Sequence, residues 1–208
     1  MTTFYIDTSS SYLYTGIVKD NNLLNEKKEL LGHNLSIYTQ DMVKRMFDEV
    51  NLKPNDIDKI IIVNGPGSFT GIRIGVTLAK IFAYSLNKKI TIISSLEAMS
   101  KSIKTDKLIV PLIDARREAC YAAIYDNDKC ILDGCYLTLE KLSLFLNGLG
   151  KEYVFVSNDK FDFETVKYNP DILEIVKYYQ DKEDINPHFV NPSYLKLTEA
   201  EENKLKEV

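Results

Sequence analysis

The sequence has no tryptophan and is poor in the residues that most often bind metal ions. It contains two histidines and three cysteines among 208 residues. Cys120, Cys130 and Cys135 are odd in number and lack the paired spacing of metal ligands, and His33 and His188 lie far apart in the chain. We therefore expect no metal site, and we expect the cysteines to be reduced thiols, as in a cytoplasmic protein.

Long hydrophobic runs and an excess of basic residues are also missing. No apolar run reaches the roughly eighteen residues of a membrane span without charged or polar breaks, so no membrane contact is expected. A strand-like pattern begins with the first residues, which leaves no recognisable targeting segment. The net charge of −4 argues against direct nucleic-acid binding as the main task. Any role in RNA metabolism should pass through a partner.

The most distinctive stretch of the chain is Lys59–Leu86. Its β-branched run Ile60–Val63 predicts a strand that is buried on both faces. The glycine-rich turn Asn64–Gly67 follows, and Ser68 is placed to cap the next helix. Such a turn leaves unpaired N–H groups at the positive end of a helix, which suits an anion. However, the spacing matches neither the dinucleotide-binding fingerprint nor the Walker phosphate loop.

The helix after this turn is apolar on nearly every face. Gly71, Gly75, Ala79 and Ala83 recur at every fourth residue, and such a ridge of small side chains permits close approach of another backbone. An all-round apolar helix must be covered on more than one side. Either it is the central helix of one domain, or a partner's helix docks on it. In the second case, Gly75→Leu should block docking and leave the monomer folded, at most a few kcal/mol less stable.

Periodicity divides the rest of the first half into strands and helices. The strand patterns are Thr2–Thr8, Tyr12–Lys19, Leu23–Leu31, Ile60–Val63 and Lys89–Ile93. The helix patterns are Leu35–Val50, Ser68–Leu86 and Leu96–Ile103. The polar stretch Lys101–Lys107 is the expected boundary between an N-terminal half, residues 1–104, which carries the candidate partner-binding helices, and a smaller second half, residues 105–208.

The second half begins as a copy of the first. Three pairs of residues are each 107 positions apart: Asp7 and Asp114, Tyr14 and Tyr121, and Ile17 and Ile124. Both copies consist of a strand, an aspartate, a polar turn and a second strand, which indicates duplication. The later elements expected are strands at Cys130–Leu137 and Tyr153–Ser157, helices at Leu139–Asn147 and Asp171–Tyr179, an extended segment at Pro187–Pro192 and a charged tail at Ser193–Val208.

The two aspartate turns are candidate phosphate loops. Serine and threonine hydroxyls with backbone amides can hold phosphate, and an aspartate beside them can hold hydrated Mg²⁺. The alternative is an ordinary Asx or serine turn with no ligand. The candidate residues of these loops and of the glycine-rich turn are Asp7, Thr8, Ser9, Gly65, Gly67, Ser68, Asp114 and Arg116.

Several of these stretches together resemble the TsaB (YeaZ-like) family. They are Ile6–Ser9, His33, Asn64–Arg73, Asp114–Glu118 and Pro192–Lys196. The segment GPGSFTGIRIG is the most specific, and the resemblance extends from residue 1 to about residue 200. Family members usually have arginine where this chain has Lys196, so a forked donor is replaced by a point charge.

The resemblance implies an α/β fold of the actin-like (ASKHA, RNase H-like) superfamily. Each of its two halves would hold a three-stranded meander extended by parallel strands, with helices. It implies a non-catalytic subunit in bacterial synthesis of threonylcarbamoyladenosine (t6A) on tRNA, paired with the paralogous transferase TsaD. The ATPase TsaE would join that pair, and a homodimer would form without the paralogue. The chain would bind no cofactor alone, with ATP or ADP, Mg²⁺ and tRNA held by the assembled complex.

In the family, the helices that match Leu35–Val50 and Ser68–Leu86 form a four-helix bundle with the paralogue. The interface residues that this implies are Leu35, Tyr38, Met42, Met46, Phe69, Gly71, Ile72, Gly75, Val76 and Ala79.

Two enzyme functions remain as alternatives. One is an ATP-dependent small-molecule kinase or ATPase that uses Asp7, Thr8, Ser9 and Asp114. Its working relatives have a glycine-rich second turn, where this chain has Arg116, Arg117 and Glu118. The other is an M22-type peptidase, which has little support because no Ser/His/Asp or Cys/His arrangement is readable.

Overall fold

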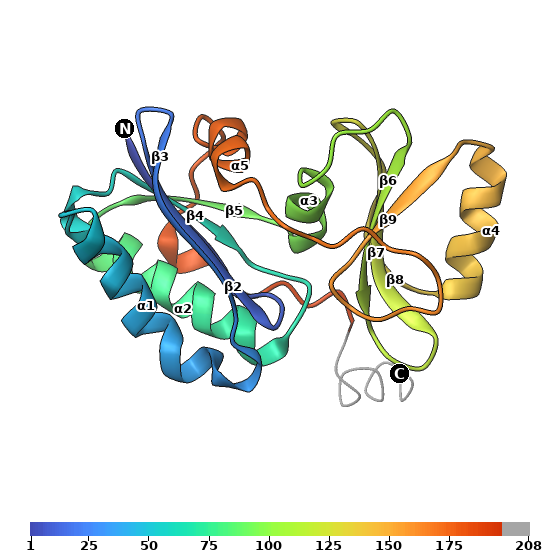
Figure 1. Cartoon of the computed structure of the whole chain (residues 1–208), viewed down its shortest axis with the longest axis horizontal. Coiled ribbons are helices and arrows are strands. Elements are labelled where there is room, and N and C mark those ends of the chain that lie inside the picture. Colours follow the sequence, from blue (N-terminus) through green and yellow to red (C-terminus); the bar gives the residue numbers. More distant parts are fainter. Residues whose placement is uncertain (197–208) are drawn as a thin grey trace.

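Two mixed β-sheets, one from each half of the chain, form the framework of the computed structural model (Figure 1), which describes residues 1–196. The first sheet has the order β3-β2-β1-β4-β5, in which β1–β3 form an antiparallel meander and β4 and β5 continue it in parallel. Its strands are β1 (Thr2–Asp7), β2 (Tyr12–Lys19), β3 (Asn22–Leu30), β4 (Lys59–Val63) and β5 (Lys89–Ile93).

Helices cover both faces of this sheet. They are α1 (Leu35–Glu49) and α2 (Phe69–Ser85) on one face, α3 (Ser95–Ser100) after β5, and α5 (Ile172–Tyr179) on the other face. Strand alternation explains the two cores, because Ile60 and Ile62 of β4 face α1 and α2 while Ile61 and Val63 face α5 and α3. The prediction that β4 is buried on both faces is therefore confirmed.

The second sheet repeats the meander and one parallel strand of the first. Its order is β8-β7-β6-β9, with α4 between β8 and β9 in the place that α1 has between β3 and β4. These elements are β6 (Leu108–Asp114), β7 (Ala119–Asp126), β8 (Lys129–Thr138), α4 (Leu139–Leu149) and β9 (Tyr153–Val156). The predicted duplication and the two-half α/β class are thus confirmed.

The C-terminal part of the described chain returns to the first half, which the sequence did not predict. Helix α5 packs on β1, β2 and β3, and the short 3₁₀ helix η3 (Pro187–Phe189) lies beside α2. Lys59 is almost fully buried, and its Nζ donates to the carbonyl oxygen of Lys182 at 2.8 Å and pairs with Asp184 at 2.9 Å. The division at residues 104 and 105 stays a prediction.

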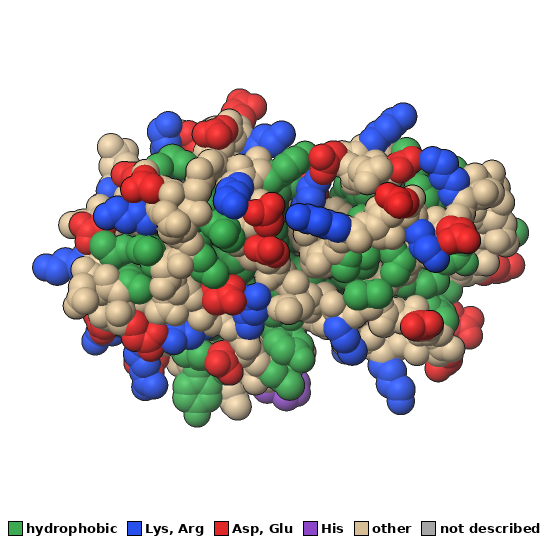
Figure 2. Space-filling view, turned by 45° about the horizontal axis from the view of Figure 1, so that its top comes forward, with side chains coloured by type: hydrophobic (Ala, Val, Ile, Leu, Met, Phe, Trp, Pro, Cys, Tyr) green, Lys and Arg blue, Asp and Glu red, His purple; other side chains and the backbone are tan. Residues whose placement is uncertain are grey.

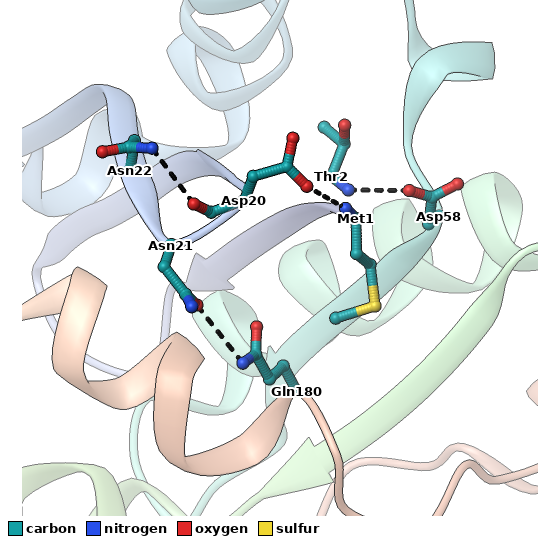
Figure 3. Close-up of polar contacts among 7 residues, drawn as sticks. All are labelled: Met1, Thr2, Asp20, Asn21, Asn22, Asp58 and Gln180. Atoms are coloured by element: carbon teal, nitrogen blue, oxygen red, sulfur yellow. Dashed lines mark hydrogen bonds and ion pairs between the residues drawn. The ribbon is translucent and has the colours of Figure 1, made fainter.

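The N-terminus is tied to the same half by reciprocal polar contacts (Figure 3). The Thr2 amide donates to Asp58 Oδ2 at 2.7 Å, and the Asp58 amide donates to the Thr2 carbonyl at 2.8 Å. The ammonium group of Met1 pairs with Asp20 in the β2–β3 turn. Gln180, just after α5, donates to Asn21 in that turn at 3.3 Å. The N-terminus and the chain just after α5 are therefore both tied to the first sheet.

Two expected segments differ from the structure, and one lies partly outside it. The helix expected at Leu96–Ile103 is the shorter α3, which ends at Ser100. The segment Pro187–Pro192, expected to be extended, begins with η3, because Asn186 Oδ1 accepts the His188 amide and a proline occupies the first helical position. Of the charged tail Ser193–Val208, residues 197–208 lie outside the described residues.

The ridge of small residues on α2 faces this chain's own backbone, not a partner. A Cβ on Gly71 would lie 2.1 Å from the Thr8 carbonyl oxygen, and a Cβ on Gly75 would lie 2.4 Å from Thr8 Oγ1. Ala79 and Ala83 are also buried. The first interpretation, a central helix whose small residues admit neighbouring backbone, is correct for this side.

The burial also corrects the list of expected interface residues. The structure buries seven of the ten in this chain's own core, so their side chains are not available on the surface: Leu35, Met46, Gly71, Ile72, Gly75, Val76 and Ala79. Tyr38 and Phe69 are exposed, and Met42 is half-buried. Because Gly75 faces Thr8, we expect Gly75→Leu to act on the stability of this chain itself.

We predict that Gly75→Leu lowers the free energy of unfolding by about 2 kcal/mol or more, because the new side chain collides with Thr8. Gly148 in α4 is the matched control, since a Cβ there meets no atom within 4 Å. Gly148→Ala should raise the free energy of unfolding by up to about 1 kcal/mol through helix propensity. Urea unfolding measures both, and a Gly75→Leu protein as stable as the wild type would contradict the burial.

Candidate functional site

The outer faces of α1 and α2 form an exposed apolar surface. Ile37 on α1 is 63% exposed, and Ile81 and Tyr84 on α2 are 54% and 68% exposed. Phe69 is exposed at the start of α2. The small residues of α2 face inward together with Ile72 and Val76, and other large apolar side chains of this helix are left on the outside. We call the outer faces of these two helices the helix surface.

Two adjoining grooves run along the helix surface. One, of about 480 Å³, extends between α1 and the first half of α2, from Phe69 to Ile81. The other, of about 590 Å³, extends from Ile37 toward Phe82 and the loop after α1. Gln40 and Leu78 line both grooves. A surface of this shape, apolar and grooved between two helices, suits the apolar side of another helix.

A cleft of about 460 Å³ separates the two sheets at the aspartate turns. It brings together five of the predicted phosphate-loop residues, which come from both halves: Ser9, Gly67, Ser68, Asp114 and Arg116. Asp7, Thr8 and Gly65 do not line it. The structure thus places both aspartate turns beside one cleft, although three of the eight candidate residues do not line it.

The carboxyl group of Asp7 is buried and already bonded on both oxygens. Oδ1 accepts the Ser9 amide at 2.8 Å in an Asx turn, and Oδ2 accepts the Tyr168 hydroxyl at 3.2 Å. Burial raises the pKa of Asp7 above its ordinary value of 3.8, against the lowering effect of these hydrogen bonds. Tyr168 lies 161 residues from Asp7, and no local pattern in the sequence signalled its role.

The glycine-rich turn packs directly against the first aspartate turn. The Ser68 amide, at the start of α2, donates to the Ser9 carbonyl at 2.7 Å, and a Cβ on Gly67 would lie only 2.1 Å from that oxygen. Ser68 Oγ accepts the Gly71 amide, as the predicted helix cap requires. A Cβ on Gly65 would lie 2.6 Å from the Ser193 carbonyl oxygen. These glycines therefore admit the chain's own backbone.

The second aspartate turn has the same Asx geometry with a different backbone. Asp114 Oδ1 accepts the Arg116 amide at 2.8 Å, and Arg116, Arg117 and Glu118 all adopt left-handed conformations with φ between 53° and 64°. Asp159 accepts the Asp114 amide at 2.8 Å, and burial raises the pKa of Asp159. Sequence reasoning missed Asp159, because it follows β9 in a stretch without a motif.

Clusters of metal-binding side chains and membrane-spanning helices are both absent from residues 1–196. No three His, Cys, Asp or Glu side chains come together there as a group that could hold a metal ion. Within the same residues, no helix has the length and apolar character needed to cross a membrane.

The chain is similar to proteins of tRNA modification. The family model described as TsaD, tRNA N6-adenosine threonylcarbamoyltransferase, matches residues 29–175. The tRNA threonylcarbamoyladenosine biosynthesis protein TsaB of Bacillus subtilis is 32% identical, over 97% of this chain and 96% of that protein. The protein of the same name from Buchnera aphidicola is 26% identical, over 91% of this chain and 95% of that protein.

Solved structures share the fold. YeaZ from Pseudomonas aeruginosa superposes with a TM-score of 0.75 at 18% identity, covering 93% of this chain and 99% of that one. A second Pseudomonas aeruginosa structure, described as uncharacterized with similarity to peptidase YeaZ, gives 0.78 at 19% identity, covering 94% and 99%. At this identity the likeness establishes the fold, in which each of two halves is built on a mixed β-sheet with helices.

The identity to the Bacillus subtilis protein extends over nearly the whole of both chains, and the transferase-type model covers more than half of this one. The chain belongs to the TsaB (YeaZ-like) family of tRNA threonylcarbamoyladenosine biosynthesis proteins.

Proposed function

We propose that this chain is a non-catalytic subunit of t6A synthesis that binds and supports the TsaD-type transferase through the helix surface. The observation that carries the proposal is the exposure of large apolar side chains along two neighbouring helices whose small residues are turned inward. Contiguous apolar surface of this kind marks interaction sites in soluble proteins. The docking residues are then Ile37, Tyr38, Met42, Phe69, Ile81 and Tyr84, three of which belong to the interface expected from the sequence.

The aspartate turns support a non-catalytic role. Both oxygens of Asp7 accept hydrogen bonds from within the chain, and the first amide of α2 donates to the Ser9 carbonyl. A nucleotide phosphate with Mg²⁺ would need those groups free. The same contacts weigh against the kinase or ATPase alternative.

The wider assembly is part of the proposal. A TsaE-like ATPase joins the pair, a homodimer forms through the helix surface when the paralogue is absent, and ATP or ADP with Mg²⁺ is held by the assembled complex in the cytoplasm. Transfer RNA is contacted only through the complex. In support, the net charge is −4, and the face in Figure 2 shows acidic and basic side chains interspersed, not the continuous positive field that nucleic-acid binding favours.

We predict that Ile81→Glu weakens binding to the TsaD-type paralogue of the same organism by at least about tenfold, because a charge would be buried in an apolar contact. Size-exclusion chromatography and calorimetry of the mixed proteins measure this. Leu144→Glu on α4 is the matched control, since Leu144 is as exposed but lies on the other half, and it should bind like the wild type. Equal binding by both variants, or no complex with the wild type, would refute the assignment.

We predict that the isolated chain shows no micromolar binding of ATP with Mg²⁺ in calorimetry, since the Ser9 carbonyl and the Tyr168 hydroxyl occupy the groups needed. A micromolar isotherm that Asp7→Ala abolishes would instead support the kinase or ATPase alternative.

We predict that Asp7→Asn becomes more stable relative to the wild type as pH rises above 3.8, the ordinary pKa of an aspartate. The folded-state pKa of Asp7 lies above its ordinary value of 3.8, so the folded wild type binds more protons between the two values and loses stability as pH rises through that window. The difference in free energy of unfolding should grow by about 1.4 kcal/mol per unit of pKa shift. Urea unfolding of both proteins at several pH values measures this difference. A flat profile for Asp7→Asn would contradict the burial effect.

A further inference from the structure

The groove between α1 and the first half of α2 contains one charged side chain, Arg73. Its other lining residues are uncharged: Ser36, Thr39, Gln40, Phe69, Thr70, Ile74, Thr77, Leu78 and Ile81. Arg73 is exposed and lies one helical turn after Phe69. The single positive charge in an otherwise neutral groove indicates which charge an occupant should carry at this point.

The guanidinium group of Arg73 is held in one place by two aromatic rings. Its Cζ lies 3.7 Å from the centre of the Phe69 ring, and its Nε donates to the Tyr194 hydroxyl at 2.9 Å. The Phe69 and Tyr194 rings are themselves stacked at 5.2 Å. Within residues 1–196 the two Nη groups of Arg73 form no ion pair or hydrogen bond. The end of the fork is therefore available to a second molecule.

Tyr194 is in turn positioned by the C-terminal segment. The Ser193 amide donates to the Asn64 carbonyl at 2.8 Å, and Asn64 Nδ2 donates to the Asn191 carbonyl at 3.0 Å. These bonds fix the segment to the end of β4, beside the start of α2. Arg73 is thus oriented before any partner arrives, which reduces the entropy lost when it binds.

We infer that Arg73 recognises a carboxylate side chain on a helix of the docking partner whose apolar side fills this groove. The planar guanidinium fork matches a carboxylate in two-point geometry. A helix that docks over Phe69 and Ile81 removes water from Arg73, and a desolvated cation without a counter-charge opposes binding. The neutral, largely apolar remainder of the groove favours a protein helix over a nucleic-acid phosphate, the other anion that fits the fork. Tyr194 is a positioning residue for this contact.

This inference rests on the proposed function. The salt dependence of the affinity for the paralogue tests the inference separately from the proposed function. The affinity for the TsaD-type paralogue is measured by calorimetry at 50 and 300 mM NaCl for the wild type, Arg73→Met, Arg73→Lys and Tyr194→Phe. The wild type should weaken as salt increases. Arg73→Met should bind about tenfold more weakly at low salt and lose most of that salt dependence, while Arg73→Lys and Tyr194→Phe should fall in between. Arg117→Met, an exposed arginine of the second half, should match the wild type.

The outcomes distinguish the alternatives. Wild-type affinity and salt dependence in Arg73→Met, with binding still lost in Ile81→Glu, would overturn the inference and leave the proposed function standing. A wild type that forms no complex would overturn both. Arg73→Met that forms the complex normally but loses tRNA binding in a filter assay would also overturn the inference, because it would assign Arg73 to a phosphate. Thermal melts identify any misfolded variant. If Arg73→Met is misfolded, the affinity of Tyr194→Phe decides the outcome, because this variant removes only a surface hydroxyl.

Discussion

The arrangement of the first half depends on how closely α2 approaches the turn after β1. Thr8 Oγ1 donates to the Gly71 carbonyl at 2.7 Å, and Gly71 and Gly75 leave no room for a Cβ between helix and turn. Glycine in a helix interior costs about 1 kcal/mol of helix stability relative to alanine. The packing of α2 on the sheet, which these glycines allow, offsets that cost. Once the small residues face inward, with Ile72 and Val76 beside them, Phe69, Ile81 and Tyr84 of α2 are left exposed. The inner packing of α2 and the apolar character of the helix surface therefore have the same cause.

The same approach explains why the predicted phosphate loops are closed. The glycine-rich turn and the first aspartate turn have the local geometry expected of them, with a capped helix and an Asx turn. The Ser9 carbonyl, however, accepts the first amide of α2, and the Tyr168 hydroxyl bonds Asp7. The backbone groups of these two turns could surround an anion, but here they form hydrogen bonds with each other. The turns therefore connect the strands of the sheet to α2.

Local elements were largely predictable from the sequence, and contacts between distant segments were not. The β-branched run Ile60–Val63 and the cap Ser68 placed β4 and α2 within one residue, because short-range sterics and hydrogen bonds determine both. The sequence did not show what the small-residue ridge of α2 faces. Small residues at every fourth position can pack against this chain's own sheet or against a partner's helix equally well. Tyr168 and Tyr194 were missed as site residues because each acts across more than a hundred residues, on Asp7 and Arg73 respectively. The periodicity of hydrophobic residues in the sequence gives no information about contacts between residues so far apart.

The two sheets differ in their number of strands, and this difference shows how the second half contributes to the structure of the first. In the first sheet β4 pairs with β5, whereas in the described part of the second half the corresponding side of β9 carries only a single bridge, from Val156 to Val166. From there the chain returns to the first sheet through α5 and η3 and ends its described course at Tyr194 and Lys196, beside the helix surface and β8. Lys196 lies over the Tyr136 ring of β8 at 4.8 Å, so the segment that orients Arg73 is held at its far end by the second half. The helix surface on α1 and α2 therefore takes part of its geometry from the second half.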